Sequence, residues 1–274
     1  MSAPPFGAFA RIWPHGRASE IAAAMRSAGL TCAQWNFSAV GRQTVSADLT
    51  EEDYQAVADA FAAESLPIWG LSVTHNNTHP DPDRREQLQA AAVSMIRLAP
   101  LLGVTAVTIS AGSCHESGWE AHPDNATPRA WNEMRTGLDR LLTAAADAGV
   151  AIGIEPEAGS IVSDTAAARR LLDEVGPGSS AAIILDAWNL AAGDRTRSSR
   201  EVVDEAFQVL GADSVGLQAK DPYNATFPEP TVDYEQVAAL QAQYCPGTSV
   251  VIQDVAADSM AVTVARLKTA WAAR

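Results

Sequence analysis

Short apolar segments rich in β-branched residues alternate with longer amphipathic segments along the whole chain. The apolar segments have the length of buried strands, and the amphipathic ones, rich in Ala, Leu, Glu and Arg, have the composition of helices. The predicted strands are Gly7–Trp13, Thr31–Asn36, Pro67–Thr74, Ala106–Ala111, Ala151–Glu155, Ala182–Asp186, Ser214–Ala219 and Ser249–Gln253. The predicted helices are Ala18–Ala28, Glu51–Glu64, Arg84–Leu102, Arg129–Ala148, Asp164–Glu174, Arg200–Leu210, Tyr234–Gln243 and Ser259–Ala272.

These segments form successive strand–helix pairs at intervals of about 30 to 35 residues, as in a (β/α)8 barrel. Thr50 and Asp53 form a capping box at the start of the predicted helix Glu51–Glu64. Asp164 is placed to cap the predicted helix Asp164–Glu174. Glycines that would take left-handed C-cap positions stand between helices and strands at Gly29, Gly103, Gly149 and Gly211. The expected fold is therefore an α/β (β/α)8 TIM barrel, with residues 1–274 as a single domain.

A doubly wound open sheet is the alternative architecture. It would require a glycine-rich phosphate loop after the first strand, and the segment ARIWPHGRAS is not one. The proline-rich stretches follow strands and not helices, so they are expected to be loops at the C-terminal face of the barrel. They cover Thr78–Asp83, Pro123–Pro128 and Pro222–Thr231.

The formal net charge of −14 argues against a nucleic-acid-binding protein, whose surface is normally basic. No run of about 20 apolar residues predicts a membrane span, and the N-terminus does not have the pattern of a signal peptide. The expectation is a cytoplasmic protein. Cys32, Cys114 and Cys245 are scattered and odd in number, which argues against a disulfide framework or a structural zinc site.

The histidines all follow predicted strands, and none lies in a predicted helix: His15, His75, His79, His115 and His122. In a barrel these positions belong to the face that carries active sites. His75, at a strand end, is the best candidate among them for acid–base chemistry. His79 stands in the sequence HPDP and is equally suited to shaping a turn. The alternative for the whole set is the ordinary occurrence of histidine in loops.

Polar residues end the strands of the second half of the chain: Glu155, Asp186 with Asn189, Gln218 with Lys220 and Asp221, and Gln253 with Asp254. A carboxylate directly after an apolar strand is buried or nearly so, and it needs a cation, a metal or strong hydrogen bonds to stay ionised. Oxygen-rich convergence of this kind suits a hard divalent cation. The alternative is a buried network in which Lys220 pairs with Glu155 or Asp186.

Aromatic residues stand at or after the predicted strand ends, where they are candidates to stack on a sugar ring or, alternatively, to pack over the core: Trp13, Trp35, Trp119 and Trp188. Arg11 and Lys220 are candidate contacts for an anion. Because no glycine-rich phosphate loop is present, the sequence does not indicate a phosphorylated substrate.

Five segments carry a resemblance to a known family: HPDP at 79–82, the GSC…W…HPDN…AW segment at 112–131, IEPE at 154–157, LDAWNL at 185–190 and QAKD at 218–221. Their order and their places on consecutive strand ends resemble the xylose-isomerase-like barrel superfamily, which groups sugar-phosphate isomerases and epimerases with endonuclease IV. The resemblance covers nearly the whole chain.

The resemblance implies a divalent metal held by Glu, Asp, His and Glu after strands five to eight. At these positions the chain has Glu155, Asp186, Gln218 and Gln253. The two carboxylates match the family pattern, whereas Gln218 replaces its His and Gln253 replaces its second Glu. Lys220 and Asp221 match an HxKD motif, whereas Asn189 replaces the His of a DxxH motif. The oxygen-only set favours Mg²⁺ or Mn²⁺ over Zn²⁺.

The expected catalytic residues are Glu155, Lys220, His75 and Glu157. The expected substrate-binding residues are His79, Trp13, Trp188, Asn189, His115 and Trp119. Gln253 is not among the bases, because an amide does not accept a proton near neutral pH.

The first functional hypothesis is an isomerase or epimerase that acts on a sugar, keto-sugar or cyclitol by proton transfer next to a carbonyl. A lyase or dehydratase on a related polyol or keto-glycoside, and a catalytically weakened sugar-binding barrel, are the alternatives. An endonuclease is disfavoured by the charge and by the loss of His at Gln218. The expected partner is a small carbohydrate, with no nucleic acid or membrane; a homodimer is also considered, because such barrels often pair.

Overall fold

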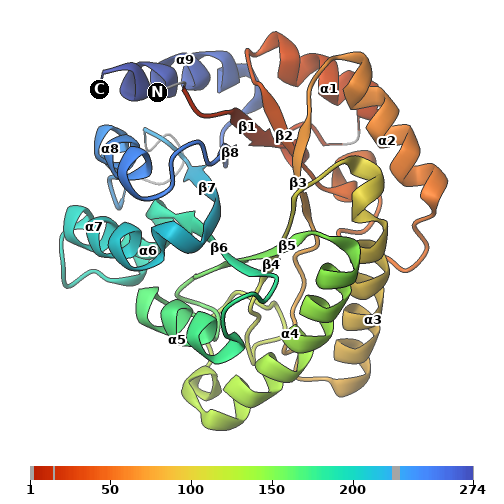
Figure 1. Ribbon diagram of the computed structural model, residues 1–274, viewed down its shortest axis with the longest axis vertical. Helices are drawn as coiled ribbons and strands as arrows, with labels where there is room; N and C mark the ends of the chain where they lie inside the picture. Colours follow the sequence, from red (N-terminus) through yellow and green to blue (C-terminus); the bar gives the residue numbers. More distant parts are fainter. Residues whose placement is uncertain (1–2, 15, 224–228, 274) are drawn as a thin grey trace.

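The computed structural model describes residues 3–14, 16–223 and 229–273. Parallel strands, hydrogen-bonded in chain order from β1 to β8, close into a barrel through the pairing of β8 with β1 (Figure 1). The strands are β1 Phe6–Phe9, β2 Cys32–Trp35, β3 Ile68–Ser72, β4 Ala106–Ser110, β5 Ala151–Glu155, β6 Ala181–Asp186, β7 Ser214–Lys220 and β8 Val250–Gln253. The predicted (β/α)8 barrel is confirmed.

The α-helices lie outside the barrel and cover its strands (Figure 1). They are α1 Ala18–Ser27, α2 Glu51–Ala63, α3 Pro82–Leu98, α4 Pro128–Ala148, α5 Thr165–Val175, α6 Ala187–Gly193, α7 Ser199–Leu210, α8 Tyr234–Tyr244 and α9 Met260–Ala272. Short 3-10 helices are η1 Ala10–Ile12, η2 Phe37–Val40, η3 Ala99–Leu102, η4 Pro123–Ala126, η5 Gly211–Asp213 and η6 Ala257–Ser259. None of the helices in the described part of the chain is both long and apolar enough to span a membrane.

Side-chain caps define several helix starts where the sequence predicts them. Thr50 and Asp53 form the expected capping box of α2, and the Asp164 carboxylate accepts from the Ala167 backbone N–H at the start of α5. The predicted left-handed role of Gly211 is wrong, because its φ of −57° is helical. A Cβ there would lie 2.6 Å from the Tyr244 Cβ, so Gly211 serves close packing instead.

Two short helices alter the predicted strand ends. The first strand stops at Phe9, and η1 takes up Ala10–Ile12, so the second half of the predicted strand Gly7–Trp13 is wrong. After β6 the chain turns directly into α6, a helix that is not among the predicted ones. Both changes occur at the C-terminal end of the barrel, and each redirects side chains that follow a strand. The predicted loop Pro222–Thr231 lies partly outside the described residues.

The strand register brings the predicted polar residues to one level. Glu155 pairs with Ser110 of β4, Asp186 with Gln218, and Lys220 with Gln253. Because all strands are parallel, these pairs lie at the same, C-terminal end of the barrel, where (β/α)8 proteins build their sites.

Candidate functional site

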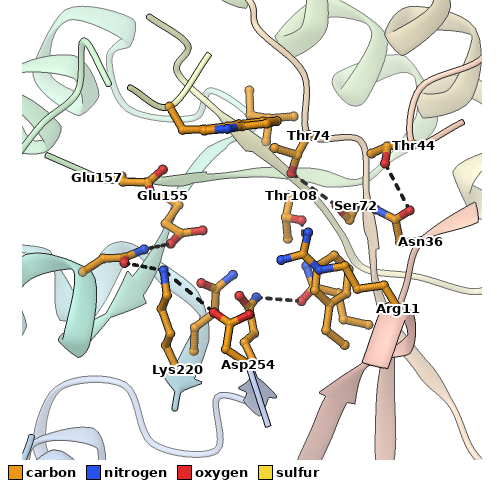
Figure 2. A pocket seen from close by; sticks show the side chains of 17 residues that line it. Arg11, Asn36, Thr44, Ser72, Thr74, Thr108, Glu155, Glu157, Lys220 and Asp254 are labelled. Carbon is orange, nitrogen blue, oxygen red and sulfur yellow. Dashed lines mark hydrogen bonds and ion pairs between the residues drawn. The ribbon is translucent and has the colours of Figure 1, made fainter. Parts of the chain in front are cut away.

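A pocket of about 380 Å³ opens at this end of the barrel (Figure 2). Its volume is at the lower end of the range for small-molecule sites, about 300 to 1,000 Å³. Polar side chains predominate in its lining, which comprises Phe9, Arg11, Gln34, Asn36, Thr44, Ser72, Thr74, Thr108, Ile109, Trp119, Glu155, Glu157, Asn189, Gln218, Lys220, Gln253 and Asp254. The pocket therefore suits a small polar ligand.

Asn189 joins a carboxylate and an ammonium group in the pocket. Its Nδ2 donates to Glu155 Oε1, and its Oδ1 accepts from Lys220 Nζ at 2.9 Å (Figure 2). Lys220 Nζ also lies 3.9 Å from an Asp254 carboxylate oxygen and 4.9 Å from the centroid of the Trp188 ring. The amide thus fixes the separation between Glu155 and Lys220.

The position of Asn189 follows from the capping of α6. Asp186 Oδ1 accepts from the backbone N–H groups of Trp188 and Asn189 at 2.9 and 3.0 Å. A carboxylate that accepts two N–H groups at a helix start stabilises that start. Asp186 therefore sets the direction of α6 and with it the place of Asn189.

Burial raises the pKa of Glu155, and the charges of Asp186 and Glu157 raise it further. The Lys220 charge lowers this pKa, but the net shift is upward. Burial also raises the pKa of Glu157 and of Asp186, and in both cases Lys220 opposes the shift. A carboxyl group with a raised pKa holds and releases a proton nearer to neutral pH than an ordinary Glu. This is the property that a general acid–base residue requires.

Neutral amides and hydroxyls line the pocket from β8 through β2 to β4. Gln253 Nε2 donates to Gln34 Oε1 at 3.5 Å, and Gln34 Nε2 donates to Thr108 Oγ1 at 2.8 Å. Asn36 Nδ2 donates to Ser72 Oγ at 3.1 Å. The pocket residues of β2 to β4, Gln34, Ser72 and Thr108, are not among the predicted site residues. Polar residues inside otherwise apolar strands were the signal that could have found them.

The four positions implied for a metal contain two buried acceptors. Asp186 Oδ2 and Gln218 Oε1 are both buried, and no described residue hydrogen-bonds to either. A cation would satisfy such oxygens, and together with Glu155 and Gln253 they form an oxygen-only set that fits Mg²⁺ or Mn²⁺ in donor type. The described residues contain no group of three or more His, Cys, Asp or Glu placed to hold a metal, and no nitrogen or sulfur ligand favours zinc.

Seven predicted site residues line the pocket: Glu155, Glu157, Asn189, Gln218, Lys220, Gln253 and Trp119. Asp186 and Trp188 do not line it but contact residues that do, through the Asn189 backbone and the Lys220 ammonium. Trp13 is half-buried against the core and does not line the pocket.

The structure does not bring the predicted histidines His75, His79 and His115 to the pocket lining. His75 is buried, with Nδ1 2.8 Å from the Val73 carbonyl oxygen, and burial lowers its pKa. His79 Nδ1 accepts from the Asp81 N–H at 3.1 Å, so His79 shapes the turn before α3, which was the alternative to a role in binding. His115 Nδ1 lies 3.0 Å from Ser117 Oγ. His15 lies outside the described residues.

The loop after β4 is seated against the loop after β5 at the pocket mouth. A Cβ at Gly159 would lie 1.7 Å from the Trp119 carbonyl oxygen, so only glycine permits this approach. Asn125 Nδ2 donates to the Gly159 carbonyl oxygen at 2.9 Å. Trp119 is held at the mouth with 52% of its surface exposed, which leaves its ring available to a ligand.

Comparisons with known proteins agree with this architecture. A family model described as "Xylose isomerase-like TIM barrel" matches residues 22–238. No curated protein matches the chain.

Several solved structures are similar in fold at low sequence identity. D-psicose 3-epimerase from Clostridium cellulolyticum H10 is 11% identical with a TM-score of 0.75, and 3-keto-D-glucoside 4-epimerase from E. coli is 15% identical with a TM-score of 0.72. In both cases the match covers 97% of this chain and 99% of the other. A xylose isomerase domain protein from Planctomyces limnophilus is 15% identical, with coverages of 98% and 96% and a TM-score of 0.72.

Proposed function

The chain belongs to the xylose isomerase-like TIM barrel family, and from this premise we propose that it is a sugar isomerase or epimerase. It would move a proton next to the carbonyl group of a sugar, keto-sugar or cyclitol. The observation that carries the proposal is the connection of Glu155 to Lys220 through Asn189 inside a pocket of small-molecule size.

In this proposal Glu155 is the acid–base residue. Its carboxylate accepts the proton from the carbon next to the carbonyl, and the same group, now protonated, delivers a proton to the former carbonyl carbon. The hydroxyl proton passes to the former carbonyl oxygen, so that the carbonyl and hydroxyl groups exchange places. The raised pKa makes both directions accessible. The Lys220 ammonium is a hydrogen-bond donor that can stabilise negative charge developing on the carbonyl oxygen. Asn189 holds the two groups in fixed relation, and the amides and hydroxyls that line the pocket from β8 through β2 to β4 bind the sugar hydroxyls.

The amide of Gln253 affects whether the reaction can be an epimerisation or an isomerisation, because these differ in the number of bases that they need. Epimerisation between two opposed carboxylates needs a second base, and an amide does not accept a proton near neutral pH. Isomerisation needs only one base, which moves a proton between adjacent carbons on one face. Glu157 is the remaining candidate for a second acid–base residue, because it also lines the pocket.

A divalent cation, when bound, would polarise the substrate carbonyl. Glu155, Asp186, Gln218 and Gln253 would hold it through oxygen atoms, which supports Mg²⁺ or Mn²⁺ rather than Zn²⁺.

The test is deuterium exchange at the carbon next to the carbonyl, measured by NMR for ketoses, inososes and keto-glycosides in deuterated water. Glu155→Gln should abolish exchange, whereas Glu52→Gln on the exposed surface of α2 should leave it unchanged. Tight sugar binding without exchange in the wild-type protein would instead favour the sugar-binding barrel. Exchange that survives in Glu155→Gln would contradict the catalytic assignment.

A further inference from the structure

The charged residues of the pocket are divided unequally between its two sides. The side formed by β5 to β8 and the segments that follow them carries Glu155, Glu157, Lys220 and Asp254. The lining residues of the other side, from β1 to β4 and the segments that follow them, are neutral apart from Arg11. Among the described lining residues, Arg11 is thus the one charged group on that side, and an anionic ligand group would bind it more strongly than a neutral hydroxyl.

Arg11 belongs to η1, the 3-10 helix that replaces the end of the predicted first strand. Figure 2 shows its side chain extending from the β1 side toward the middle of the pocket. The guanidinium carbon lies 4.5 Å from the centroid of the Phe9 ring, which restrains the planar group. No ion pair or hydrogen bond joins Arg11 to another residue within the described ranges. Its fork of N–H donors is therefore available to a ligand.

Thr108 offers a neutral donor to the same pocket. Its Oγ1 accepts from Gln34 Nε2, and no bond recorded for the described residues uses its hydroxyl hydrogen. Because Thr108 is buried and lines the pocket, that hydrogen can be satisfied by a ligand acceptor.

We propose that Arg11, together with Thr108 of the same pocket lining, forms a subsite for a carboxylate carried by the substrate, so that the enzyme acts on a sugar acid. This inference rests on the proposed function for the identity of the reaction but concerns a separate part of the pocket. A carboxylate fits the bidentate geometry of a guanidinium. A phosphate monoester is the other anion to consider, and the sequence around Arg11, ARIWPHGRAS, is not a glycine-rich phosphate loop.

Calorimetric binding to the full-length protein tests the subsite with ligands that differ only in the acidic group. The probes are D-galacturonate, D-galacturonamide and D-galactose 6-phosphate, followed by the same series for D-glucose and by aldonates. Wild-type protein should bind at least one sugar acid about tenfold more tightly than its neutral amide and more tightly than the phosphate ester.

The variant Arg11→Gln should lose this preference while binding of the neutral amide stays the same, and Arg11→Lys should keep only part of it. Arg26→Gln, which removes an exposed cation of α1, should keep the full preference. Equal or undetectable binding of acids and amides by the wild type, tighter binding of the phosphate ester, or a preference that survives Arg11→Gln would each overturn the proposal. Glu155→Gln should abolish exchange while the protein still prefers the acid over its amide, so failure of the catalytic assignment is seen separately.

Discussion

Asp186 and Gln218 are directly paired in the register of β6 and β7, and each buries a side-chain oxygen that no described residue hydrogen-bonds. A buried acceptor without a donor is unfavourable, so each of these oxygens would be stabilised by a cation or a proton. Burial raises the pKa of Asp186, which is the direction expected when no cation is bound.

Asp186→Asn should stabilise the metal-free protein at alkaline pH. The amide oxygen can still cap α6, and the new Nδ2 can donate to Gln218 Oε1. Because the folded-state pKa of Asp186 is raised, its ionisation costs folding free energy as pH rises, so the gain should be about 1 kcal/mol at pH 9 and vanish at pH 4. Urea unfolding in the presence of a chelator measures it. A gain that is equal at both pH values would contradict the argument.

Glu157→Gln should move the pH dependence of exchange to lower pH. The Glu157 charge raises the pKa of Glu155, so without it the Glu155 carboxylate forms at lower pH and the rising part of the rate profile shifts with it. Lys220→Met should shift the rising part of the rate profile to higher pH, because the Lys220 charge lowers the pKa of Glu155. The pH profile of kcat/KM checks both, and shifts in the same direction would be inconsistent with this account.

Asn189→Leu should lower kcat at least about tenfold with a smaller change in KM, because it removes both hydrogen bonds that position Glu155 and Lys220. Asn189→Asp should keep a partner for Lys220 but place a carboxylate against Glu155. The rising limb of its pH profile should therefore move to higher pH. If kcat and the pH dependence of the rate are unchanged in both variants, Asn189 does not position Glu155 and Lys220.

Gln218→His should increase Zn²⁺ affinity at least about tenfold and leave Mg²⁺ affinity nearly unchanged, because it supplies the nitrogen ligand that the oxygen-only set lacks. Calorimetric titration with each metal measures the change. Asn132→His on the exposed surface of α4 is the matched control. An unchanged Zn²⁺ affinity in Gln218→His would show that position 218 does not face the cation.

The barrel could be predicted from the sequence because short apolar segments typical of strands alternate with longer amphipathic segments typical of helices along the whole chain. Glu155 and Gln218 were predicted for the pocket because a polar residue at the end of an apolar parallel strand has only the C-terminal face to reach. The direction of a residue after the strand depends on local dihedral angles instead. His75 follows β3 closely, yet its ring turns to the Val73 carbonyl oxygen.

The short helices show the same limit. Asp186 was expected as a ligand because it ends a strand, but its carboxylate also accepts from two backbone N–H groups and begins α6. Arg11 was expected inside a strand, and only the turn into η1 gives it its place in the pocket. In both cases a helix of three to seven residues turns the chain, and such a helix is too short for hydrophobic periodicity to indicate it.

The contact between Gly159 and the Trp119 carbonyl means that the entrance of this pocket cannot be redesigned one loop at a time. Any side chain at position 159 would displace the neighbouring segment before it altered the ligand directly. Libraries that aim to widen the substrate range should therefore vary the β4 and β5 loops together, and exchanges of a single loop between homologous barrels are expected to fail even where the catalytic residues are kept.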